Sequence, residues 1–170
     1  MVSATDTTSR RTPDKNLVGF LLGDARYAVD ILRVREIINP LPLVQLPHAP
    51  EPILGVADHR GEVVPVVDLR RRFGLPPAEP TRHTKWILVS LEAAQGGAPV
   101  AGLVVDAVTD VFGAGPSDRR DVPALGEGDE RRGIRGVFAV GGTLTFVIDV
   151  DAVADCTRQL DVSGLRRTPS

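Results

Sequence analysis

The chain of 170 residues has little cysteine, few aromatic residues and almost no net charge. Cys156 is the only cysteine, which excludes an intramolecular disulfide and a zinc site of four thiolates and favours a reducing compartment. With five Phe, one Trp and one Tyr, valine and leucine must fill most of the core. A net charge of −2, from 20 basic and 22 acidic side chains, gives no broad attraction to nucleic acid, so we expect no such partner.

Long apolar runs are also missing. No segment approaches the roughly 20 apolar residues that a membrane-spanning helix needs, so we expect no membrane insertion. The stretch from Met1 to Asn16 is polar and rich in Ser and Thr, unlike a signal peptide. We therefore expect a cytoplasmic protein, with residues 1–14 forming a flexible tail.

Motifs of catalysis and metal binding are absent as well. His48, His59 and His83 each lack a second His or Cys at the spacing of metal ligands. The glycine-rich phosphate and dinucleotide loops, the zinc-protease motif and the nucleophile elbow do not occur. Cys156 is interpreted as a small apolar residue packed near the last helix. We expect no enzyme activity, no metal and no cofactor.

One hairpin pattern occurs twice. The stretch G-V-A-D-H-R-G-E-V-V-P-V-V-D-L starts at Gly55, and G-V-F-A-V-G-G-T-L-T-F-V-I-D-V starts at Gly136. Two apolar runs around a tight turn predict a β-hairpin in each copy, with the first turn at Arg60-Gly61. Asp68 and Asp149 occupy matching positions at the strand ends, where we expect them to cap a helix or turn.

The rest of the chain predicts further short strands. A hairpin is expected around Gly23-Asp24, and another from Trp86 to Val105. Asp30 is expected to cap one helical turn that leads into a strand carrying Glu36, although some apolar residues there also fit helical spacing. The segment from Gly113 to Arg132 is rich in charge, Gly and Pro, and predicts a long exposed loop.

Two details of the repeated strands carry specific predictions. Pro65 lacks an N–H, so its strand is expected at a sheet edge or a bulge. The first copy has no plainly polar face, so either the other half or a partner should cover its outer side. In the second copy, Leu144, Phe146 and Ile148 should form a buried face opposite Thr143 and Thr145.

These observations predict an all-β fold of two small β-barrels with a few short helices. The domain is expected over residues 15–156, with its halves joined near 74–84 and a C-terminal tail over 157–170.

Three separated stretches resemble the CheW family, the adaptor proteins of bacterial chemosensory arrays. They are F-L-L-G-D-A-R-Y-A-V-D-I-L-R-V-R-E-I-I from Phe20, I-L-G-V-A-D-H-R-G-E-V-V-P-V-V-D-L-R-R-R-F from Ile53, and G-L-V-V-D-A-V-T-D-V from Gly102. The resemblance extends from about Leu17 to Asp155 and is specific, because the motifs occur in order at suitable spacing. No phosphotransfer, ATPase or receiver segment accompanies them, so we expect a stand-alone adaptor.

The resemblance implies two SH3-like five-stranded barrels. It also implies a scaffold that links the cytoplasmic tip of chemoreceptors to the CheW-like regulatory domain of a CheA-type histidine kinase, within a chemoreceptor array. Arg60 matches the arginine of the family's N-L-R-G turn, which is tied to receptor and kinase coupling. Val34 and Glu36 match positions near the kinase-facing surface, and Gly55 matches the glycine before the turn.

Asp58-His59 stands where the family commonly has Asn-Leu, which suggests an altered contact or a different partner. One alternative function is therefore a divergent regulator that binds only receptor or only kinase. Another is a small-ligand or enzyme module in the groove between the barrels. The protein-binding residues also have structural alternatives: Arg60 as a solvated turn residue and Glu36 paired with Arg33 or Arg35. Val34 would then be a core residue, and Gly55 would serve only the backbone.

Overall fold

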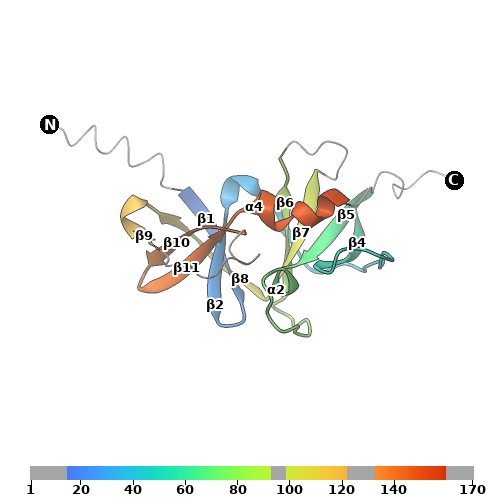
Figure 1. The fold of residues 1–170 in the computed structure, drawn as a ribbon, viewed down its shortest axis with the longest axis horizontal. Coiled ribbons are helices and arrows are strands. Elements are labelled where there is room, and N and C mark those ends of the chain that lie inside the picture. Colours follow the sequence, from blue (N-terminus) through green and yellow to red (C-terminus); the bar gives the residue numbers. More distant parts are fainter. Residues whose placement is uncertain (1–14, 93–98, 122–132, 160–170) are drawn as a thin grey trace.

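The structure is a computed structural model that describes residues 15–92, 99–121 and 133–159. It consists mostly of β-strands in two sheets that lie side by side, with a few short helices between and around them (Figure 1). The predicted all-β class is confirmed. The predicted tail over 1–14 and part of the predicted loop, 122–132, lie outside the described residues.

The six-stranded sheet has the order β8-β1-β2-β11-β10-β9, and the five-stranded sheet has the order β3-β6-β7-β5-β4. The strands are β1 (Lys15–Leu22), β2 (Ala25–Asp30), β3 (Val34–Ile38), β4 (Ile53–His59), β5 (Glu62–Asp68), β6 (Lys85–Ser90), β7 (Val100–Val105), β8 (Ala107–Ala114), β9 (Arg119–Arg120), β10 (Ile134–Val140) and β11 (Thr143–Ile148). The helices are η1 (Ile31–Arg33), α2 (Leu69–Arg72), η2 (Pro116–Asp118), α4 (Val150–Val153) and η3 (Asp155–Gln159).

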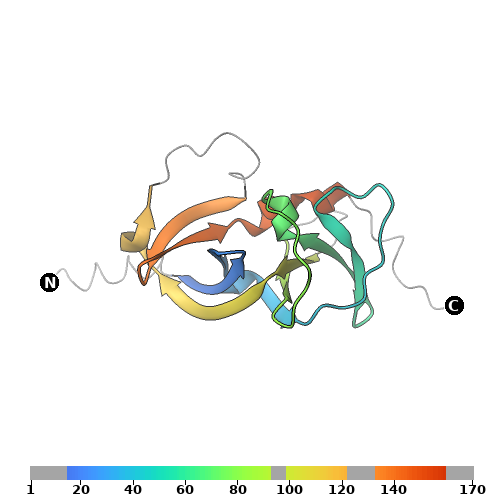
Figure 2. The same ribbon diagram turned by 90° about the horizontal axis from the view of Figure 1, so that it is seen from below.

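The chain crosses between the two sheets. β3 follows the β1-β2 hairpin but pairs with β6 of the five-stranded sheet. In the same way, β8 follows the β6-β7 hairpin but pairs with β1 of the six-stranded sheet. The five-stranded sheet is therefore built from one continuous stretch, β3 to β7, and the six-stranded sheet joins β1 and β2 to β8 to β11. The crossing segments lie in the middle of the molecule (Figure 2).

The expected junction of the two halves near 74–84 does not coincide with a change of sheet. The strands on either side of that segment, β5 and β6, belong to the same five-stranded sheet. The chain crosses between sheets after β2 and after β7 instead. The C-terminal boundary also differs, because Thr157 is buried within η3 and its hydroxyl donates a hydrogen bond to the carbonyl oxygen of Ala154.

The repeated hairpins are confirmed as β4-β5 and β10-β11. Both turns use the left-handed backbone that a tight hairpin needs: φ is 55° at Arg60 and 86° at Gly61, and 57° and 81° at Gly141 and Gly142. The carboxylate of Asp68 accepts a hydrogen bond from the Arg70 N–H. Asp149 caps α4 in the matching position, and Asp30 caps η1, as predicted.

The main core lies between the two sheets. Val67 on β5 belongs to one buried cluster with Phe20 and Tyr27 of the other sheet. On the same strand, Val66 is buried in a cluster with Ala57 and Trp86. The valine-rich run is thus buried on both faces, and the other half of the chain covers its outer side.

Two predictions about the repeated strands are partly wrong. β5 is an inner strand, between β4 and β7, so Pro65 is not at an edge. Val56, which lies opposite Pro65 in β4, directs its backbone groups to Val44. The backbone of Pro65 therefore faces β7. The pairing of β5 with β7 begins only at Val66, so the N–H that Pro65 lacks is not needed for any hydrogen bond of the paired segment.

The second error concerns β11. Ile148 is buried as predicted, but Thr145 is fully buried as well, and Leu144 is 54% exposed. Val147, on the same face as Thr145, packs with Leu17 and Ala28 inside the six-stranded sheet. The predicted loop after Gly113 is also partly wrong, because η2 and β9 continue the chain along β10.

Candidate functional site

Three of the predicted protein-binding residues form one ion-pair cluster, which we call the Glu36 cluster: Glu36, His59 and Arg60. The Arg60 guanidinium donates two hydrogen bonds to the Glu36 carboxylate, at 3.1 Å and 3.0 Å. His59 Nε2 lies 3.5 Å from Glu36 Oε1. The side chain of Arg60 is 74% exposed, so the pair presents an ordered guanidinium to solvent.

The fold explains why these residues meet. Glu36 lies on β3 and the other two residues lie at the end of β4 and in its turn, at opposite edges of the five-stranded sheet. The sheet must curl to bring these edges together. Ile38 of β3 packs against the cluster that contains Ala57 of β4, which supports the same approach from the apolar side. The alternative in which Glu36 pairs locally with Arg33 or Arg35 does not describe the structure, since Glu36 bonds Arg60 and Arg33 bonds Asp151.

Asp58 orients the turn that carries Arg60. Its carboxylate Oδ1 accepts a hydrogen bond of 2.8 Å from the Gly61 N–H. That bond closes the turn around Arg60, whose backbone has a positive φ of 55°. Asp58 therefore contributes to the Glu36 cluster through the backbone, not by direct contact with Glu36.

Gly55 lies at the other end of β4 and does not join the cluster. Its φ is 153°, and a Cβ at this position would approach the carbonyl oxygen of Val44 to 2.4 Å. The connector before β4 crosses directly over Gly55, and Val44 forms a two-bond bridge with Val56. The structural alternative for Gly55, which is space for the backbone, has direct support.

Val34 begins β3 and is half-buried. Its side chain packs against the core cluster shared by the two sheets, and its N–H closes η1 by donating to the Ile31 carbonyl oxygen. Val34 is thus on the same strand as Glu36 but contacts the core, and the ion pair does not include it.

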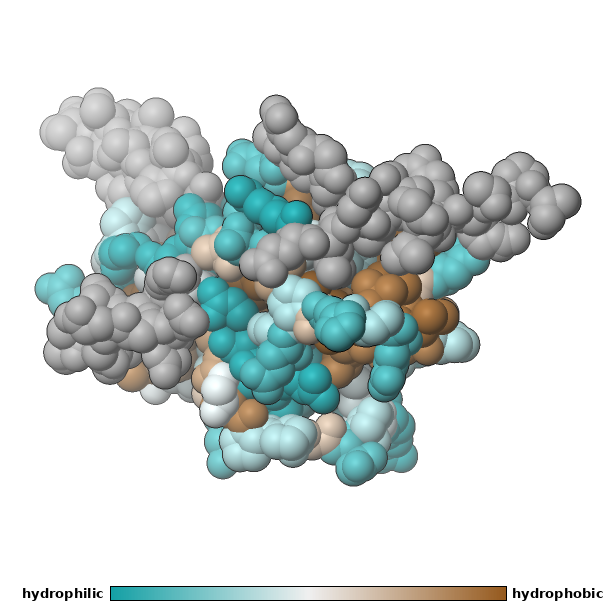
Figure 3. Space-filling model, turned by 45° about the vertical axis from the view of Figure 1, so that its right-hand side comes forward, coloured by the Kyte–Doolittle hydropathy of each residue, from teal (hydrophilic) through white to brown (hydrophobic). Residues whose placement is uncertain are grey.

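Exposed apolar side chains, which were not predicted from the sequence, surround part of this sheet. Ile37, next to Glu36 on β3, is 40% exposed, and Val44 on the connector is 63% exposed. Figure 3 shows hydrophobic surface gathered to one side of a hydrophilic centre on one face of the molecule. The signal in the sequence was the proline-rich connector, which holds Leu43 and Val44 in an extended surface segment.

The described residues include no group of three or more His, Cys, Asp or Glu side chains placed to hold a metal ion. None of the described helices is long and apolar enough to cross a membrane. Cys156 packs against the shared core as expected, and burial raises the pKa of its thiol. Arg70, Arg71 and Arg72 lie in α2, and the Arg70 guanidinium bonds the Asp106 carboxylate.

Comparisons with known proteins identify a family. The model of the CheW-like domain matches residues 16–157. The chemotaxis protein CheW of Rhizobium meliloti (strain 1021) is 39% identical over 140 residues, which cover 82% of this chain and 86% of that protein. Chemotaxis protein CheW of Bacillus subtilis (strain 168) is 29% identical over 149 residues, covering 88% and 92%. The crystal structure of the scaffolding protein TtCheW from Thermoanaerobacter tengcongensis superposes with a TM-score of 0.72 at 26% identity, covering 82% of this chain and 87% of that one.

Proposed function

The chain belongs to the CheW family, and we propose that it is a cytoplasmic, non-catalytic adaptor that couples chemoreceptors to a CheA-type histidine kinase. The proposal rests on the family match over most of the chain and on a structural neighbour that is itself a scaffolding protein. An adaptor of this kind binds two partners at once, and the many contacts of an array supply avidity to modest individual contacts.

The observation that carries a specific contact surface is the Arg60–Glu36 ion pair. Most exposed arginines sample many rotamers, but this guanidinium is held at two points by Glu36 and by a turn that Asp58 closes. An ordered, exposed guanidinium loses less rotational freedom on binding than a free one. We place the partner-binding surface at this corner of the five-stranded sheet, where Asp58 supports the turn, while Val34 and Gly55 support β3 and β4 from outside the Glu36 cluster.

The test separates the charge of each residue from the ion pair itself. Three variants are needed: Arg60→Glu, Glu36→Arg, and the double variant that exchanges both residues. Arg82→Glu, a charge reversal in a loop of the same chain, is the matched control. Each protein is titrated separately with the CheA-type kinase and with a receptor signalling fragment from the same organism.

If Arg60 makes the contact, Arg60→Glu weakens binding of at least one partner, and the exchanged variant fails to restore it while recovering thermal stability. If the pair serves only to hold β3 against the turn, the exchanged variant restores both. Loss of binding in Arg82→Glu to the same extent would show a general charge effect. No binding of either partner by the unchanged protein would contradict the adaptor role.

A divergent regulator that binds only one partner is the second candidate, and His59 favours it. His59 takes the place of a common apolar residue of the family and contacts Glu36 at 3.5 Å, so it adds a polar group to this corner. Asp58→Asn combined with His59→Leu restores the common pair. Gain of the missing partner by this variant would support the regulator, and equal binding of both partners before and after the change would contradict it.

A further inference from the structure

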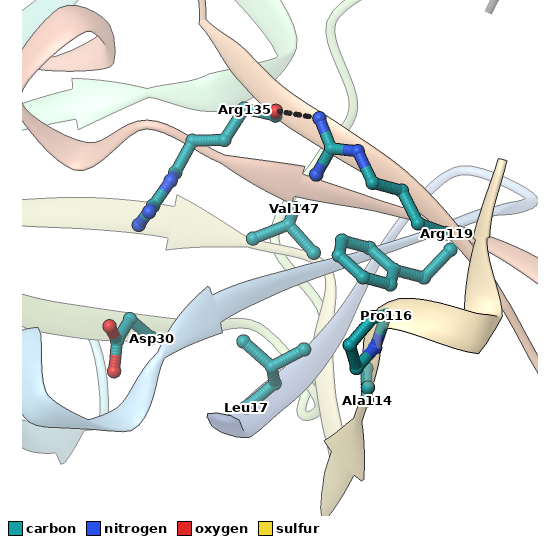
Figure 4. A pocket seen from close by; sticks show the side chains of 9 residues that line it. Leu17, Asp30, Ala114, Pro116, Arg119, Arg135 and Val147 are labelled. Carbon is teal, nitrogen blue, oxygen red and sulfur yellow. Dashed lines mark hydrogen bonds between the residues drawn. The ribbon is translucent and has the colours of Figure 1, made fainter. Parts of the chain in front are cut away.

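The six-stranded half contains a pocket that has no part in the Glu36 cluster. Its volume is about 440 Å³, and apolar and charged residues line it together: Leu17, Asp30, Ala114, Gly115, Pro116, Arg119, Arg135, Phe138 and Val147. Figure 4 shows Leu17 and Val147 pointing toward one another across its floor. The volume lies within the range of small-molecule sites, roughly 300–1,000 Å³.

The pocket exists because the six-stranded sheet has a small buried cluster on this side. Leu17, Ala28, Ala114 and Val147 are its buried members, and three of the four are alanine or valine. The five-stranded sheet buries Trp86 in the corresponding place on β6. Gly19 of β1 occupies the equivalent position in the six-stranded sheet. Trp86 lies opposite Val104, two residues before Asp106, and Gly19 lies opposite Ala28, two residues before Asp30.

Two arginines form one side of the pocket. Arg119 of β9 lies opposite Phe138 of β10, and its guanidinium is 5.6 Å from the centre of the Phe138 ring. One of its nitrogens donates to the carbonyl oxygen of Arg135 at 3.3 Å. Gly136 leaves room for this arrangement, because a Cβ there would approach Arg119 Nη1 to 2.7 Å. Arg119 is therefore held in place and keeps N–H groups to donate.

Arg135 is the second arginine, and its guanidinium makes no hydrogen bond or ion pair with any residue that the structure describes. The only carboxylate in the lining is Asp30, and its Oδ1 is engaged in capping the Leu32 N–H at 2.9 Å. The lining thus carries two positive charges and one negative charge over an apolar floor.

From this combination we propose that the pocket binds a small organic anion, a carboxylate with an apolar body. The carboxylate pairs with Arg135 and with the remaining donors of Arg119, as planar guanidinium groups prefer. The apolar body packs on Leu17, Val147 and the Phe138 ring. The site lies within the six-stranded half, and it does not depend on the adaptor role.

The test uses phenylacetate, with neutral phenylacetamide and cationic phenethylamine as matched probes. Amide resonances of the full-length protein are followed by two-dimensional NMR during each titration. We expect phenylacetate to shift the amides of Leu17, Asp30, Ala114 and Val147, and to bind about tenfold more tightly than the amide. Arg135→Gln should remove this tenfold preference, whereas Arg82→Gln should leave it unchanged.

A second pair of variants tests the pocket by volume. Ala114→Leu should fill it and abolish the shifts caused by phenylacetate and phenylacetamide, while the spectrum of the rest of the domain stays folded. If Ala114→Leu does not fold, Val147→Ile fills the pocket with a smaller change. Equal binding of phenethylamine, shifts confined to other parts of the molecule, or no shift at roughly 10 mM phenylacetate would overturn the proposal.

Discussion

Arg33 and Asp151 join the two halves of the molecule by a bidentate ion pair across 118 residues of chain, with distances of 3.1 Å and 2.7 Å. Arg33 lies in η1, where the chain crosses from one sheet to the other, and Asp151 lies in α4 after the second repeated hairpin. Asp151 Oδ1 also accepts a hydrogen bond of 3.0 Å from the Glu92 N–H, at the end of β6.

The first repeated hairpin has the same device with the charges exchanged. Arg70 in α2 bonds both carboxylate oxygens of Asp106, at 3.0 Å and 2.6 Å. Asp106 follows β7 at the other crossing and accepts a hydrogen bond of 2.7 Å from the Gly23 N–H. Arg70 is two residues after the cap Asp68, and Asp151 is two residues after the cap Asp149. Both hairpins are thus followed by a helix that forms an ion pair with a crossing segment, but the helix supplies the arginine in the first case and the aspartate in the second.

We expect these bridges to hold the crossing segments in place. Asp151→Asn leaves the partly buried Arg33 guanidinium without its counter-charge and should lower the free energy of unfolding by about 1–3 kcal/mol. Asp155→Asn is the control, because its pair with Arg158 is 64% exposed on both sides and should matter little. Urea denaturation measures both. Equal effects of the two substitutions would show that the Arg33–Asp151 ion pair stabilises the fold no more than an exposed ion pair does.

The same two carboxylates predict how stability depends on pH. The hydrogen bond from Arg70 holds the pKa of Asp106 below its ordinary value, and the hydrogen bond from Arg33 does the same for the pKa of Asp151. A pKa that is lower in the folded state gives stabilisation above the unfolded value, about 3.9 for aspartate, and loses it as pH falls through the folded value.

Thermal unfolding should therefore show a steep loss of stability below about pH 4. In the double variant Asp106→Asn, Asp151→Asn, the melting temperature should be lower at neutral pH and should change less on acidification. If the melting temperature of the double variant falls on acidification as steeply as that of the unchanged protein, other carboxylates cause the loss of stability.

Local signals in the sequence were enough to predict most single elements. The turn at Arg60-Gly61, the caps at Asp30, Asp68 and Asp149, and the repeated hairpins all follow from residues close together in the chain. Such features depend on backbone conformation and on short-range hydrogen bonds, which the sequence specifies directly.

Pairings between distant segments could not be predicted in this way. β3 and β8 each join a different sheet from the hairpin that precedes them. This placement depends on which strand edges meet in the folded chain, and neither strand's sequence indicates its partner. Glu36 has two arginines beside it in sequence, yet it bonds Arg60 because the sheet curls. β9 has only two residues, too few for a pattern, so its Arg119 falls in a segment that the sequence predicts as a loop.

The two glycines of the first hairpin should respond differently to substitution. Gly55→Ala forces a Cβ against the backbone of Val44 at a strained φ, so we expect a loss of about 3 kcal/mol or more. In Gly61→Ala the new Cβ meets no atom within 4 Å. Only the positive φ of 86° is unfavourable for alanine, so we expect a loss of about 1 kcal/mol in the free energy of unfolding. Chemical denaturation of both variants gives the comparison. A smaller loss for Gly55→Ala would mean that the connector over β4 moves aside at little cost.

Two threonines, Thr145 in β11 and Thr157 in η3, are both buried but differ in hydrogen bonding. Thr145 is 0% exposed and its hydroxyl oxygen has no hydrogen-bond partner among the described residues. Thr157 is 2% exposed and donates to the Ala154 carbonyl oxygen at 2.7 Å. Burial of a hydroxyl is costly unless a hydrogen bond compensates it, and valine has nearly the same shape. Thr145→Val should therefore raise the free energy of unfolding by about 1 kcal/mol, whereas Thr157→Val should lower it by a similar amount. If Thr145→Val destabilises the protein as much as Thr157→Val does, the Thr145 hydroxyl has a partner in solution, such as a bound water, inside the six-stranded sheet.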